Sequence, residues 1–180
     1  VMNSQREIIY SQRQKVLAGE DVSGSVHTMM HESITGTASL YLGGDNASEW
    51  NFEGLRDYYL RWLCGPDDFH YDEEALKTLT REEVIKVLTD RAELITKNKE
   101  KRYGSPLMRE FERMILLRVV DTKWMEHIDA MEELRKGIHL RSYGQHDPVV
   151  EYRVEGFKMF DEMVDSIRAD TTLLLLTMQL

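Results

Sequence analysis

Hydrophobic residues recur every three or four positions along most of the chain, which is the spacing of one face of an α-helix. The pattern is clearest in two long runs, one from Ser105 to about residue 138 and one starting at Pro148. The first run carries Leu107, Phe111, Met114, Leu117, Trp124, Ile128, Met131, Leu134 and Ile138. The second carries Val149, Tyr152, Gly156, Phe160, Met163, Ile167, Leu174 and Thr177. We predict two antiparallel helices that pack along a shared seam.

Four shorter helices are predicted before residue 104. They cover residues 2–17, residues 26–38, an aromatic stretch at 55–63 that ends before Gly65-Pro66, and a run that starts after Thr80 and continues toward Gly104. Thr80 opens the last of these with the sequence of a capping box. Residues 20–103 therefore form a small helical subdomain, with an acidic side between residues 41 and 76.

The three prolines lie at positions 66, 106 and 148, where the helical periodicity stops or starts. Ser105 is expected to cap the first long helix, with Pro106 at its first position. Long spans without proline favour an all-α fold.

The chain is acidic, with 32 Asp and Glu against 23 Lys and Arg and a formal net charge of −9. Such a balance disfavours a protein that wraps nucleic acid, which needs a basic surface. Cys64 is the only cysteine, so an intramolecular disulfide is excluded, and we expect a packing residue in a reducing compartment. No apolar run approaches the roughly 20 residues that span a bilayer. No signal peptide or lipidation motif opens the chain, so a cytosolic location is expected.

Motifs for bond chemistry are absent from the sequence. None of the 11 glycines is followed by lysine, which excludes a phosphate-binding loop. His27 and His31 have the spacing of metal ligands but no evident third partner, and we predict a solvated or partly buried pair. His127, between Glu126 and Asp129, is interpreted as a paired, orienting imidazole rather than a catalytic base. We therefore expect no catalytic, cofactor-binding or metal-binding residue in this chain.

The turn between the two long runs has an unusual composition. Residues 134–146 contain no carboxylate, whereas they include the basic residues Arg135, Lys136, His139, Arg141 and His146 and the apolar residues Ile138, Leu140 and Tyr143. Turns are usually small and polar, so these side chains indicate a surface that meets a partner. The alternative is that they fold back onto the hairpin, an outcome that fits Leu140 and Ile138 better than Tyr143.

The segment from Trp124 to Pro148 closely resembles the two-helix finger of SecA, the ATP-driven motor of bacterial preprotein translocation. Residues 151–163 continue the match, and residues 1–10 resemble part of the SecA scaffold helix. The resemblance covers the whole chain. It implies a scaffold helix at 1–20, a helical wing domain at 21–104, the two-helix finger at 105–170 and the start of a returning scaffold helix at 171–180.

The resemblance also implies roles for individual residues. In the family, the finger enters the cytoplasmic mouth of the SecY channel, and a tyrosine at its tip touches the moving polypeptide. The residues expected to contact channel and polypeptide are Tyr143, Leu140, Arg141 and Gln145. The finger also restrains ATP hydrolysis, and the candidates for this regulation are Trp124, His127 and Arg135.

The implied partners are the SecY channel complex, an unfolded preprotein and the remaining domains of the same motor. ATP and Mg²⁺ would belong to the full-length motor alone, which would lie in the bacterial cytoplasm and associate peripherally with the inner membrane. One alternative is a stand-alone helical scaffold or adaptor, which the uncapped first helix and the leucine-rich end disfavour. Another is nucleic-acid binding through Arg135, Lys136 and Arg141, which the net charge disfavours.

Overall fold

The computed structural model describes residues 1–141 and 147–180, and this part of the chain is all-α, as predicted. Its helices are α1 (Met2–Leu17), α2 (Ser23–Tyr41), α3 (Phe52–Tyr59), α4 (Glu73–Thr78), α5 (Arg81–Tyr103), α6 (Ser105–Arg141) and α7 (Pro148–Thr177), with a 3₁₀ turn, η1, at Ala47–Glu49. Within the described residues, β structure is limited to one isolated bridge between Leu60 and Cys64.

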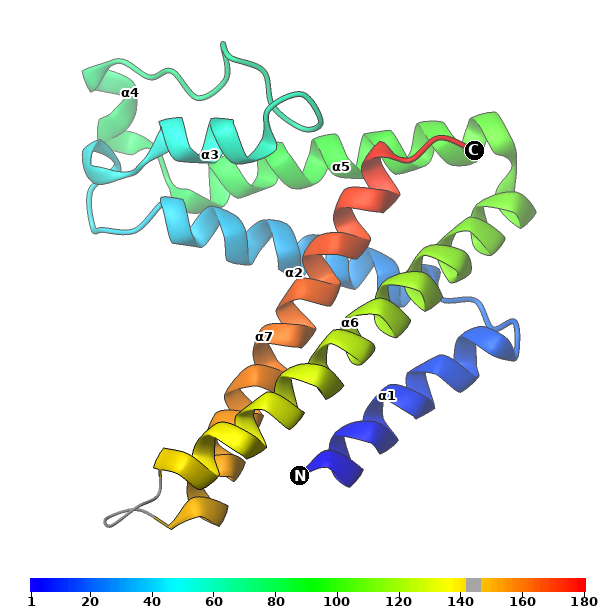
Figure 1. Cartoon of the computed structure of the whole chain (residues 1–180). Coiled ribbons are helices and arrows are strands. Elements are labelled where there is room, and N and C mark those ends of the chain that lie inside the picture. The colour runs from blue at the N-terminus through cyan, green and yellow to red at the C-terminus, as the bar shows by residue number, and fades with distance from the viewer. Residues whose placement is uncertain (142–146) are drawn as a thin grey trace.

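Two long helices form the axis of the molecule, and α2 to α5 pack around one half of it (Figure 1). Helices α6 and α7 run antiparallel as the predicted hairpin, and α1 lies along α6. Helices α2 and α5 lie side by side and cross the C-terminal part of α7. Helix α3 packs on α2, and both α3 and α4 lie toward the end of this pair that is remote from α1. One end of the hairpin is therefore embedded, while the other extends away from the rest of the chain.

The hydrophobic core joins the wing helices to the base of the hairpin. A single cluster of buried side chains runs from Ile9 in α1 through α2, α3 and α5 to Leu176 in α7. A second, smaller cluster holds the outer part of the hairpin and consists of Met131, Leu134 and Ile138, with Val1, Met2, Tyr152 and Met159 against it. The outer half of the hairpin is thus stabilised by its own seam and by the first turn of α1. The domain boundaries at 20, 104 and 170 stay predictions; α7 passes residue 170 without a break.

The buried face of α6 is wider than the predicted stripe. Phe111, Trp124 and the small cluster are buried as expected, but Leu107, Met114 and Ile128 are exposed. The positions buried instead are Met108, Ile115, Leu116, Val119 and Val120. The stripe prediction was wrong there because α6 packs against α1, α2, α5 and α7, whereas a single stripe assumes one partner.

The helix ends follow the capping rules with two corrections. Thr80 accepts a hydrogen bond from the Glu83 amide at 3.2 Å, and Asp147 accepts one from the Val149 amide at 2.9 Å. Helix α6 is opened by Gly104, whose carbonyl accepts from Met108 N, so Ser105 lies one position inside the expected cap. The aromatic helix ends at Tyr59 rather than near residue 63, because the chain turns at Arg61 with a φ of 77°.

Gly104 alone forms the corner between α5 and α6, with φ 87° and ψ 152°. This backbone region is almost exclusive to glycine. We expect Gly104→Ala to lower the free energy of unfolding by about 1–3 kcal/mol, because the strain has no outlet at a one-residue corner. Gly36→Ala is the matched control: its Cβ would meet nothing within 4 Å in the middle of α2, and it should stabilise by about 0.5–1 kcal/mol. Urea denaturation of both variants measures the difference; equal effects would contradict this account of the corner.

Candidate functional site

The outer end of the hairpin exposes an apolar side chain at the end of α6. Leu140 is 75% exposed, whereas Ile138 is 3% exposed. The fold-back alternative was therefore wrong for Leu140 and correct for Ile138. The two differ because two residues along a helix turn the side chain by about 200°, away from the seam.

Three of the four predicted contact residues lie wholly or partly beyond what the structure describes. Tyr143 and Gln145 fall outside the described residues, and of Arg141 only the backbone, at the end of α6, is described. Leu140 is therefore the one predicted contact residue whose side chain the structure places, and it is available to a partner.

Helix α7 adds a second exposed apolar surface near the same end. Val150, Val154 and Phe157 are each more than half exposed and follow one another at spacings of four and three. They form an outer stripe on the side of α7 opposite Gly156, with Arg153 and Lys158 exposed beside it. Val149 is 64% exposed, so its assignment to the seam was wrong. The outer stripe was not predicted, because α7 carries apolar residues on two faces and the expected seam accounts for one of them.

A buried polar junction lies further down the hairpin and joins α1, α6 and α7. His127 on α6 and Gln5 on α1 are 5% and 2% exposed. The His127 Nε2 atom lies 2.6 Å from Gln5 Oε1, and Gln5 Nε2 donates to the carbonyl of Gly156 at 3.2 Å. Because that carbonyl can only accept, Gln5 must present its oxygen to His127, which therefore donates from Nε2.

Close packing and aromatic contacts surround this polar junction. The rings of Trp124 and Phe160 have centroids 5.5 and 5.8 Å from that of His127. A Cβ on Gly156 would lie 2.9 Å from Met131 Cε and 3.3 Å from Val1 Cγ1, so glycine permits the three helices to approach. The prediction of a paired imidazole is thus confirmed, but its partner is Gln5 rather than a neighbouring acid. No sequence signal marked Gln5, because polar residues on a surface helix are usually solvated.

Burial also determines the chemical state of the junction. It lowers the pKa of His127, which favours the neutral ring, and the hydrogen bond to Gln5 fixes the tautomer. Trp124 Nε1 is buried and has no hydrogen-bond partner within the described residues. A buried polar contact of this kind restricts the orientation of the helices that it joins.

Arg135, the third residue predicted to regulate hydrolysis, lies apart from this junction. It is exposed two turns further along α6, and its guanidinium pairs with Glu132 at 2.5 Å. The pair lowers the pKa of the Glu132 carboxyl. Exposed pairs of this type contribute little to stability, so Arg135 is free to exchange its partner.

The remaining chemical candidates have structural partners. His27 Nδ1 and His31 Nε2 lie 3.3 and 2.6 Å from one carboxylate oxygen of Glu93. In the described ranges, no three histidine, cysteine or acidic side chains are arranged to hold a metal.

Cys64 is buried in the core, and burial raises the pKa of its thiol to about 11, in keeping with a packing residue. None of the described helices is both long and apolar enough to cross a membrane.

These features define an all-α domain in which a long hairpin, braced by a third helix, projects from a small helical wing. The sequence model of the SecA wing and scaffold domain matches residues 1–179, and the chain belongs to this family.

Curated relatives agree with this assignment. The chain is 40% identical over 177 residues to the protein translocase subunit SecA of Acetivibrio thermocellus, 40% identical over 171 residues to that of Syntrophomonas wolfei and 47% identical over 174 residues to that of Clostridium perfringens strain SM101. These alignments cover 98%, 94% and 95% of this chain but 20% of each relative. The chain thus spans about a fifth of the length of the relatives that it matches.

The buried imidazole makes the stability of the junction depend on pH. Because the folded-state pKa of His127 is lowered from its ordinary value of 6.5, the unfolded state binds more protons just below that value. The stabilisation is complete above about pH 6.5 and is lost as the pH falls toward the folded-state pKa. We expect His127→Gln, which keeps a donor toward Gln5, to lose less stability than the wild type between pH 7.5 and 5.5.

Urea denaturation at the two pH values measures this difference. His70→Gln is the matched control, because it makes the same substitution at an exposed histidine outside the junction. An identical pH dependence in His127→Gln and the wild type would show that the imidazole does not titrate with folding.

Proposed function

We propose that this chain is the wing and scaffold part of a SecA-type protein translocase, and that its α6–α7 hairpin is the finger that contacts the SecY channel and the translocating polypeptide. The observation that carries the proposal is the projecting half of the hairpin, which exposes Leu140 and the outer stripe of α7 beyond the shared core. Family membership supports the translocase and leaves the stand-alone adaptor without a favouring observation.

The chemistry of the tip fits a partner of variable sequence. An unfolded polypeptide offers backbone amides and assorted apolar side chains, which aliphatic and aromatic groups contact without selecting one sequence. The exposed Arg135 and Lys136 would contact carboxylates or carbonyls of the channel or of the polypeptide. The projecting hairpin can enter an opening while its base stays with the wing.

The junction at His127 would carry the regulatory part of this function. It links the hairpin to α1, so that a displacement of the finger changes the contacts of a second helix. Trp124 lies in the same contact, whereas the exposed Arg135 would act through a partner outside the chain. ATP and Mg²⁺ would bind elsewhere in the full-length motor, which would work at the cytoplasmic face of the membrane.

The contact role of the tip predicts a selective loss of transport. Tyr143→Ala and Leu140→Ser in the full-length translocase should lower preprotein translocation more than basal ATP hydrolysis, because both remove apolar contact area at the tip. Leu94→Ser is the matched control, since Leu94 is 58% exposed on α5, away from the tip. Transport into channel-containing vesicles and hydrolysis without channel are compared. Equal transport by all three variants would refute the tip assignment.

The regulatory role of the junction makes a different prediction. Gln5→Leu removes the two hydrogen bonds through which Gln5 joins α1 to the hairpin and leaves the tip unchanged. We expect basal hydrolysis without channel or preprotein to rise severalfold, because the restraint on the motor is weakened. Gln12→Leu, an exposed glutamine on α1, is the control. A stable Gln5→Leu variant with wild-type basal hydrolysis would remove the junction from regulation.

A further inference from the structure

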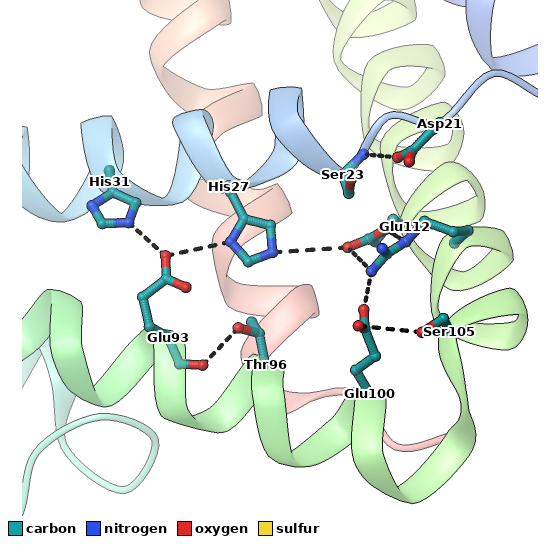
Figure 2. A network of polar contacts seen from close by, with 10 residues as sticks. Asp21, Ser23, His27, His31, Glu93, Thr96, Glu100, Ser105 and Glu112 are labelled. Carbon is teal, nitrogen blue, oxygen red and sulfur yellow. Dashed lines mark hydrogen bonds and ion pairs between the residues drawn. The ribbon is translucent and has the colours of Figure 1, made fainter.

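The corner between the wing and the hairpin carries a polar network that neither the motifs nor the proposed function explains. Figure 2 shows side chains from α2, α5 and α6 converging beside this corner. Arg109, on the first turns of α6, pairs both with Glu100 at the end of α5 and with Glu112 on its own helix. Ser105 also lies within 3.4 Å of the Glu100 carboxylate. The backbone turns there through the single residue Gly104.

The network is anchored by a fully buried carboxylate. The Glu112 side chain is 0% exposed, and its Oε1 atom lies 2.6 Å from Arg109 Nε. Burial raises the pKa of Glu112, and the Arg109 guanidinium opposes that shift. A buried carboxylate that lost this partner would be strongly destabilising. Arg109 is therefore held against α6, and its Nη2 group bridges the two carboxylates, donating to Glu112 Oε2 at 3.3 Å and to Glu100 on α5.

The same carboxylate reaches toward the second wing helix. His27 on α2 lies with Nε2 4.0 Å from Glu112 Oε2 and with Nδ1 3.3 Å from Glu93 Oε1 on α5. Between these groups is a cavity of about 320 Å³, lined in part by Thr96, Lys97 and Met108. Because this cavity is open to solvent and not filled by side chains, the packing around it leaves room for the helices to shift.

We propose that Arg109 is a positioning residue that fixes the angle between the wing and the finger by clamping Glu100 of α5 to Glu112 of α6. Helix α6 has 37 residues, or about 55 Å at 1.5 Å per residue. A rotation of about 10° at the corner would therefore move its far end by roughly 10 Å. The clamp sets where the tip is held, whichever partner the tip meets.

Distances between spin labels on the wing and on the finger test the proposal in the intact chain. The labels replace the exposed Glu82 on α5 and Glu133 on α6, with the buried Cys64 changed to Ala. Glu100→Ala removes the α5 side of the clamp and keeps Glu112 paired. We expect a distance distribution at least twice as broad as that of the parent chain, with unchanged helix content by circular dichroism.

Two further variants separate the clamp from general destabilisation. Arg109→Met combined with Glu112→Gln removes the clamp without leaving a buried charge, and should broaden the distribution as Glu100→Ala does. Arg109→Lys should give a narrower distance distribution than the double variant, because an ammonium group still lies between the two carboxylates. Arg118→Met, at an exposed arginine on the same helix, should match the parent. The proposal would be overturned if Glu100→Ala and the double variant kept the distance distribution as narrow as in the parent chain. It would also be overturned if Arg118→Met broadened that distribution equally. Neither result would bear on the proposed function.

Discussion

Close packing of α6 against α7 is the interaction on which the rest of the structure depends. Each of the other helices that contacts the hairpin does so on a surface that these two create together. The packing is tight where Gly156 faces Met131, because a larger residue there would displace the end of the methionine side chain or Val1. At that level Gln5 spans both helices, donating to the Gly156 carbonyl and accepting from His127. The position of α1 thus follows from the separation of the hairpin helices.

Buried polar groups determine which arrangement of these helices is selected. Lys99 on α5 is 7% exposed, and its ammonium donates to the carbonyls of Leu175 and Met178 at 2.7 and 2.6 Å. Those carbonyls belong to the end of α7, where a helix leaves acceptors without internal partners and where a cation is favoured. Burial lowers the pKa of Lys99, so the position is costly unless those acceptors are present. The ends of α5 and α7 are consequently joined by these hydrogen bonds as well as by the apolar core between them.

The sequence predicted the helices well, because their periodicity and end signals are local. Thr80 and Pro148 mark helix starts that the structure shares. It failed where a residue's environment is set by several partners at once: Leu107, Met114 and Ile128 follow the expected spacing and are exposed. The polar groups that orient the helices were not identifiable for a related reason. Gln5, Lys99 and Glu112 belong to residue types that are mostly solvated, and only the three-dimensional arrangement shows them to be buried.

The two halves of the hairpin differ in how much of the chain packs against them, and the acid-free residues 134–146 include the end of α6 in the less covered half. The base shares one core with the wing, whereas the outer half is packed through three buried residues and the first turn of α1. Near the base, α2 and α5 flank the hairpin and cover many of its apolar side chains, although Leu107 and Met114 stay exposed there. At the outer end nothing in the described chain covers Leu140 and Phe157, and exposing them costs solvation free energy that packing elsewhere must offset. This exposure supports the contact surface proposed above. The basic neighbours Arg135 and Lys136, each paired with a glutamate of the same helix, lie beside that surface despite the acidity of the chain as a whole.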